Sequence, residues 1–309
     1  VAWRNAPPEF ASSPLLQNPY WAINENGNED QRSRIMGFAE ANIDLEKLFD
    51  LGFKLDVTAK AGVDYYSQKR KRQTAHNTYY KADGKATLSH NESQVREENY
   101  DLRINTEKSF GGFRANATLG GSLMHRKNES ISSSSESGLI NEVGPYVIQN
   151  FLNPVTSEGI SEMEIQSFYG LFSFDYLSTV FWDVTLRNDW TSVLSPENWS
   201  YLYPSASFSW ILSETFVLPD WIGYLKTRAS WASVGSGGNY ASYRYLEYGT
   251  NANQFHGLPY GSIPGTRPEP SLKSELTISK EVGLEASMFN NRLSLDAALY
   301  QSGTEDQIF

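Results

Sequence analysis

The chain has 309 residues, with 26 lysines and arginines against 36 aspartates and glutamates, and no cysteine. A net charge of -10 argues against a nucleic-acid-binding protein, and the lack of cysteine excludes disulfide scaffolds, thiolate zinc sites and iron–sulfur clusters. Helical membrane spans are also excluded, because they need about 18 consecutive apolar residues and the runs here are far shorter.

The opening residues lack the apolar core of a signal peptide. On this basis alone we expect either a cytosolic protein or a piece from within a longer chain.

Apolar and hydrophilic residues alternate strictly over 53–65, where Phe53 and Leu55 alternate with Lys54 and Asp56. A period of two predicts a β-strand with one apolar and one hydrophilic face. The same pattern predicts about ten strands in chain order, at 34–45, 53–65, 99–108, 113–123, 166–176, 181–190, 203–212, 225–234, 276–288 and 292–300. No long helix is predicted, although 44–51 and 213–221 can each hold a helical turn.

The connections between these strands are alternately short and long. The short ones are 46–52, 109–112, 177–180, 213–223 and 289–291, and the long ones are 68–98, 126–163, 191–202 and 235–275. In an antiparallel meander, all short connections then lie at one end of the sheet and all long ones at the other. Bacterial outer-membrane barrels have this arrangement, with short periplasmic turns and long extracellular loops.

Strand length also favours a barrel, because the predicted strands of roughly 10–13 residues exceed the usual 5–6 of globular proteins and match the 9–11 that cross a membrane. Aromatic residues near the strand ends suit girdles at the lipid headgroups. They are Tyr65, Tyr100, Phe113, Trp182, Trp190, Tyr203, Trp210, Trp231 and Tyr300. The alternative is that these aromatics cap a soluble core. We expect an all-β fold, an antiparallel transmembrane β-barrel segment.

The sequence offers no arrangement of residues suited to catalysis. The four histidines, His76, His90, His125 and His256, lie far apart and form no metal-binding pair. The acidic and amide run at 24–30 has a glycine out of register for a calcium loop. We therefore expect no enzyme activity, no metal and no cofactor.

Two groups of residues are candidates for binding. One is a set of loop aromatics, whose flat faces and polar tips suit a carbohydrate or a protein partner. They are Trp199, Tyr201, Tyr240, Tyr243, Tyr245, Tyr248, Phe255 and Tyr260. Packing of these rings on one another, or in the outer girdle, is the alternative.

The other group is the basic run Lys69, Arg70, Lys71 and Arg72, just after Tyr65 and so at the expected outer membrane surface. Such cations can pair with lipopolysaccharide phosphates, although a merely solvated run is equally compatible. A hydrophilic row on the strands is expected to face the barrel interior and to contact a plug domain; it comprises Lys54, Asp56, Lys60, Asp64, Arg103, Arg114, Asp183, Arg187 and Asp189.

Several short motifs follow one another in the second half of the chain. They are YPSASFSWILSETF at 203–216, LKTRASW at 225–231, PSLKSE at 270–275 and FNNRLSLD at 289–296, preceded upstream by GVDYY at 62–66. In this order they resemble the barrel of SusC/RagA-type TonB-dependent outer-membrane transporters of Bacteroidetes. RNDWTS at 187–192 departs from the family pattern because it lacks a glycine, so a different loop is expected there.

The resemblance implies that 1–309 is part of a barrel of about 22 strands around a plug domain, with the plug and the terminal barrel strands not present. It implies import of an oligosaccharide or peptide across the outer membrane of a Gram-negative bacterium. The implied partners are a SusD-like surface lipoprotein, the TonB-ExbB-ExbD complex acting through the plug, and outer-membrane lipid with lipopolysaccharide. A soluble or surface-attached all-β carbohydrate-binding or adhesin module is the alternative.

Overall fold

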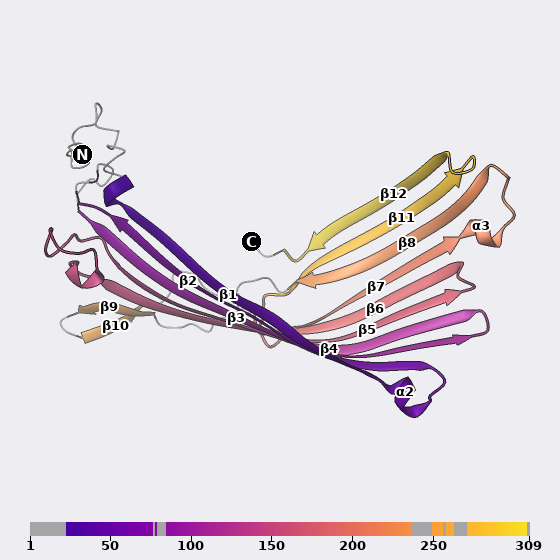
Figure 1. Ribbon diagram of the computed structural model, residues 1–309, viewed down its shortest axis with the longest axis horizontal. Coiled ribbons are helices and arrows are strands. Elements are labelled where there is room, and N and C mark those ends of the chain that lie inside the picture. The colour runs from indigo at the N-terminus through magenta and orange to yellow at the C-terminus, as the bar shows by residue number, and fades with distance from the viewer. Residues whose placement is uncertain are drawn as a thin grey trace. The chain divides into compact units, whose positions relative to one another are not determined.

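The computed structural model describes residues 23–76, 78, 85–236, 249–255, 258–262 and 271–307, with the backbone alone at 249–255 and 259–262. Ten strands follow one another across a single sheet (Figure 1). They are β1 (Gly27–Asp44), β2 (Lys54–Thr74), β3 (Thr87–Phe110), β4 (Phe113–Ser135), β5 (Val155–Tyr176), β6 (Val180–Thr191), β7 (Ser200–Ile211), β8 (Ile222–Ser236), β11 (Glu275–Met288) and β12 (Leu293–Glu305). The registers from β5 to β12 are antiparallel throughout. All ten predicted strands are thus confirmed, in the predicted meander.

The remaining elements lie in the connections. Short helices α2 (Leu45–Phe49) and α3 (Leu212–Thr215) confirm the two predicted helical turns, and a 3₁₀ turn, η2, spans Ile148–Asn150. A separate hairpin of β9 (Gly249–Phe255) and β10 (Leu258–Ser262), which the sequence did not predict, lies between β8 and β11. No helix in the described ranges is long and apolar enough to cross a membrane.

Four strands are much longer than predicted. β2, β3, β4 and β5 have 21, 24, 23 and 22 residues. The long connections expected at 68–98 and 126–163 were therefore wrong in their bounds, because much of each is strand. The period of two continues there in polar residues, so the apolar marker used to find strands is lost while the strand goes on. RNDWTS likewise remains in β6 as far as Thr191.

The chain divides into two compact units. Unit 1 comprises Val1–Gly37, Gly62–Glu98 and Arg126–Glu162, and unit 2 comprises Phe38–Ala61, Asn99–His125 and Met163–Phe309. β1 to β5 contribute residues to both units, whereas β6 to β12 belong to unit 2 alone.

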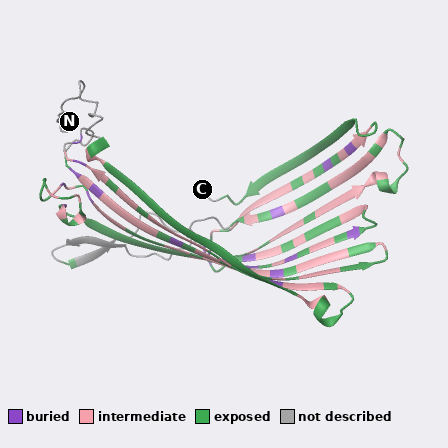
Figure 2. Ribbon diagram, viewed as in Figure 1, coloured by how far each residue is buried: buried purple, intermediate pink, exposed green. Residues whose placement is uncertain are grey.

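The sheet of unit 2 has one apolar and one polar face. Directly opposed residues of antiparallel strands share a face, so Phe174 and Trp182 lie on one face and Ser173 and Asp183 on the other. Trp182 remains 38% exposed, whereas Asp189, on the polar face, is only 6% exposed. Figure 2 shows exposed residues along the strands of this sheet. This inverts the soluble pattern, in which carboxylates are exposed and large apolar side chains are buried, and it suits a wall with lipid outside and a polar interior.

Paired aromatic rings lie near the short turns of unit 2. The centroid distances are 4.5 Å for Phe113–Tyr176, 5.8 Å for Trp182–Phe208, 5.5 Å for Trp210–Phe216 and 5.7 Å for Trp221–Phe289. These rings form the band expected of an aromatic girdle at one membrane interface.

Unit 1 has a small core where a long connection folds back on the sheet. Phe151 and Leu88 are both 1% exposed, and Leu139, Tyr146 and Ile148 pack against them. The amide of Asn150 donates to the carbonyl oxygens of Asn141 and Pro145, at 2.9 and 3.1 Å, and closes the connection on itself. We call this group, with Ala86, the loop core.

Candidate functional site

The polar face of unit 2 carries a cluster centred on Arg187. The Arg187 Nε donates to Asp189 Oδ1 at 2.8 Å, and Nη2 donates to Ser167 Oγ at 2.9 Å. Its guanidinium carbon lies 5.9 Å from the ring centres of both Tyr169 and Tyr203. The Tyr203 hydroxyl donates to Asp189 in turn, so Tyr203 lies on the polar face, opposite Arg187, and its predicted place in the lipid girdle was wrong. We call these residues the Arg187 cluster.

Other charges on the same wall are also paired. Arg228 bonds Glu281 at 3.2 Å and Asp296 at 3.0 Å, which links β8, β11 and β12. Arg114 on β4 donates to Asp175 on β5 at 2.7 Å. The predicted hydrophilic row therefore lies in cross-strand networks, at least for Arg114, Asp183, Arg187 and Asp189.

Glycines let three large side chains lie flat against this wall. A Cβ at Gly120 would overlap the ring of Tyr169, one at Gly235 would come within 2.5 Å of the Tyr201 ring, and one at Gly283 within 2.6 Å of the Arg228 Nε. Without the Cβ of the neighbouring strand, each side chain can rest on the backbone.

The ion pairs of the wall suit a structural role. Arg114, Arg187 and Arg228 each bind a carboxylate. Among the described residues no three histidines, aspartates or glutamates gather as metal ligands.

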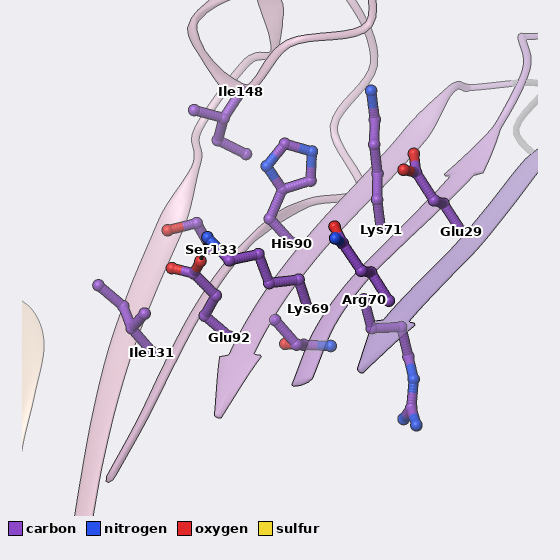
Figure 3. A pocket seen from close by; sticks show the side chains of 11 residues that line it. Glu29, Lys69, Arg70, Lys71, His90, Glu92, Ile131, Ser133 and Ile148 are labelled. Carbon is purple, nitrogen blue, oxygen red and sulfur yellow. Dashed lines mark ion pairs between the residues drawn. The ribbon is translucent and has the colours of Figure 1, made fainter. Parts of the chain in front are cut away.

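A second candidate lies in unit 1, in a hollow of about 420 Å³ that is lined by β1 to β4 and by η2 (Figure 3). We call it the β2–β4 hollow. It is lined by Glu29, Gln31, Lys69, Arg70, Lys71, His90, Asn91, Glu92, Ile131, Ser133 and Ile148. His90, which the sequence gave no reason to select, lies in it only because β3 begins twelve residues earlier than predicted and so includes position 90.

The basic run lies in β2, where successive side chains alternate between faces. Lys69 forms an ion pair with Glu92, and Arg70 forms one with Asp30 at 3.3 Å. Figure 3 shows Lys71 and His90 extending to one side and Arg70 to the other. The four cations are thus divided between two surfaces, and the contact with lipopolysaccharide stays a prediction.

The predicted loop aromatics lie in different places. Trp199 is 51% exposed and lines a hollow of about 390 Å³ with Trp190. Tyr201 stacks on Tyr203 at 5.7 Å, on the polar face. Tyr240, Tyr243, Tyr245 and Tyr248 lie outside the described residues, and Phe255 and Tyr260 are described only as backbone of β9 and β10. Their role in binding stays a prediction.

Comparisons with known proteins agree with this architecture. The profile of the family described as TonB dependent receptor-like, beta-barrel, matches residues 3–309. TonB-dependent receptor P26 of Formosa agariphila is 27% identical over 310 residues, covering 96% of this chain and 30% of that protein. TonB-dependent receptor SusC of Bacteroides thetaiotaomicron is 22% identical over 320 residues, with the same coverage of both chains.

A solved structure titled as the RagAB peptide transporter superposes with a TM-score of 0.76 at 20% identity, covering 94% of this chain and 32% of that one. At this identity the match shows the fold. The chain spans about a third of the length of the relatives it matches.

Proposed function

Because this chain belongs to the TonB-dependent receptor β-barrel family, we propose that it forms part of the wall of an active transporter that imports a nutrient oligomer, either an oligosaccharide or a peptide. The family consists of outer-membrane proteins of Gram-negative bacteria, and it is a family of transporters and receptors, not of enzymes. The soluble binding module that the sequence left open does not fit this membership.

The observation that carries the proposal is the inverted polarity of unit 2. Large apolar side chains such as Leu186, 44% exposed, lie on one face, while the paired charges of the Arg187 cluster lie on the other. A wall of this kind separates lipid from an aqueous, polar interior. Ion pairs at Arg114, Arg187 and Arg228 hold the polar face together, as suits the passive wall of a transporter.

We further propose that residues 1–309 belong to one barrel domain of a longer protein, which supplies the plug and the other strands. Both edge strands support this, because β12 is exposed along its whole length and β1 everywhere except at Asp44. The partners proposed are a SusD-like surface lipoprotein above the long connections and the TonB-ExbB-ExbD complex acting through the plug.

Uptake by intact cells tests the proposal. Cells of the source bacterium lacking the gene would be given fluorescent peptides and oligosaccharides, with and without a protonophore that removes the energy supply of TonB. We expect the deletion to abolish protonophore-sensitive uptake of one of the two substrate classes, and the full-length gene to restore it. Unchanged uptake of both classes would exclude nutrient import of these kinds.

A further inference from the structure

We propose that the β2–β4 hollow of unit 1 binds a phosphate group carried by the saccharide of a neighbouring lipopolysaccharide molecule. Lys71 and His90 would be the principal contacts (Figure 3). The site is separate from the transport path and does not depend on which substrate is imported.

The hollow lies on the side of β2 that faces lipid. Lys69 and Lys71 belong to the same alternating set as Val63 and Tyr65, an apolar residue and a girdle residue, since β2 continues without interruption as far as Thr74. Asp64, in the opposite set, forms an ion pair with Arg34 at the polar side. Lys69 is four residues beyond Tyr65, so the hollow lies beyond the girdle, where the surrounding lipid presents headgroups in place of acyl chains.

Two groups in the hollow lack a partner within the described part of the chain. The Nε2 atom of His90 is shielded from solvent and has no hydrogen-bond partner. Lys71 has no carboxylate within ion-pair distance in the described ranges, whereas Lys69 is joined to Glu92. A shielded nitrogen without a partner is costly, and an oxygen-rich anion would satisfy it together with the ammonium group of Lys71.

The hollow is bounded by fixed elements. Ile148 lies at its edge next to His90 in Figure 3, and it is held there because it packs on the loop core with Phe151. Ile131 lines the side formed by β4, and the hydroxyl of Ser133 is bonded to Thr156 at 2.9 Å. The volume of about 420 Å³ lies within the range of small-ligand sites.

The charges in the hollow favour a single phosphate over a polyanion. Glu29 and Glu92 also line it, and Glu92 already neutralises Lys69. Negative charge is therefore favoured only near Lys71 and His90. Arg70 also lines the hollow, but its guanidinium extends to the other side and is paired there with Asp30, whose carboxylate also accepts two 2.9 Å hydrogen bonds from Gln68.

The alternation of β2 provides a matched control. Lys71→Gln and Arg72→Gln remove the same charge from adjacent positions, and neither cation has an ion pair in the described structure, but the two side chains lie on opposite faces. Binding of purified lipopolysaccharide to the full-length receptor in detergent would be measured by native mass spectrometry. Resistance of each variant to heat in a gel-mobility assay would confirm folding.

We expect Lys71→Gln and His90→Gln each to weaken binding about tenfold, the effect of losing one charge-assisted hydrogen bond, and Arg72→Gln to change it less than twofold. Dephosphorylated lipopolysaccharide should bind the wild type weakly, with no further loss in Lys71→Gln. Equal effects of Lys71→Gln and Arg72→Gln, or none, would overturn the site. Displacement of lipopolysaccharide by inorganic phosphate at equal concentration would show that the bound phosphate need not come from the lipid, and would overturn this part of the proposal.

Discussion

At the scale of single residues, three glycines determine how the polar wall is packed. Tyr169 lies on Gly120 and donates its hydroxyl to Asp101 at 2.6 Å, so moving the ring away from a new methyl group would strain or break this hydrogen bond. Gly223, in contrast, has only ordinary neighbours, beginning at 3.7 Å. The two glycines therefore differ in the space available, although both lie in strands or at their start.

Gly120→Ala should destabilise the barrel by about 1–3 kcal/mol, because it overpacks the wall, while Gly223→Ala should leave stability nearly unchanged. The temperature at which the full-length receptor loses its folded gel mobility measures both. Equal shifts for the two variants would show that backbone freedom, not the space above Gly120, is what matters.

Asp30 provides a pH test in unit 1, outside the membrane-spanning segments. The hydrogen bond from Gln68, followed by Arg70, lowers the pKa of the Asp30 carboxyl below its ordinary value of 3.8. A lowered pKa in the folded state means that the bonds of Asp30 on β1 with Gln68 and Arg70 on β2, a side-chain ladder between the two strands, stabilise the protein at neutral pH. The contribution is lost as the pH falls through the folded-state pKa.

We therefore expect pepsin to cleave within 27–37 more readily at about pH 2.5 than at about pH 4.5, relative to the intrinsic activity of pepsin on an unfolded substrate. In Asp30→Asn this additional sensitivity should be smaller, since one titrating partner of the segment is gone while the Arg34–Asp64 pair remains. A wild type that shows no such change would mean that the ladder does not stabilise β1.

At the scale of elements, the connection between β4 and β5 depends on one buried ring. Phe151 is 1% exposed, whereas the next residue, Leu152, is 45% exposed. Phe151→Ala should destabilise the loop core by roughly 3–5 kcal/mol, enough to open the connection at 136–154 while the sheet remains folded. Limited proteolysis of the full-length receptor should then cut there, and Leu152→Ala should resist; cleavage of both or neither would contradict a core centred on Phe151.

The elements also show what the sequence can predict and what it cannot. All ten strands and both helical turns follow from the period of two and from the turn residues. The extensions of β2 to β5 do not, because polar residues predominate there and the few apolar ones, such as Leu88 and Val95 in β3, do not alternate on one face. For the same reason Lys69 to Arg72 looked like one basic patch, and only a strand assignment divides it.

The candidate sites were less predictable than the strands. Trp199 and Tyr201 are two residues apart, and both are aromatic. Trp199 nevertheless lines a hollow with Trp190, while Tyr201 stacks on Tyr203 on the polar face. His90 forms part of a candidate site only because Lys71 on β2 and Ile148, in the connection between β4 and β5, line the same hollow. Such contacts depend on the register between strands, which no local pattern specifies.

At the scale of the whole molecule, the orientation of the sheet in the membrane can be tested at two adjacent positions. Val184 lies opposite Phe172 and Ala206 on the apolar face, and Thr185 lies opposite Leu171 and Ser205 on the polar face. Both are near the middle of β6.

Val184→Arg should destabilise the inserted barrel by about 2–4 kcal/mol, the cost of a cation facing lipid near the midplane, while Thr185→Arg should insert nearly as well as the wild type. The folded fraction after insertion into lipid vesicles measures the difference. The reverse order would place the lipid on the other face.

β8 and β11 pair from Ser236 with Glu275 down to Ile222 with Met288, although the chain between them leaves the sheet and passes through β9 and β10. The entropic cost of closing such a connection grows only with the logarithm of its length, by about 0.6 kcal/mol for each doubling. Natural variation can therefore lengthen, shorten or replace this excursion without altering the wall beneath it.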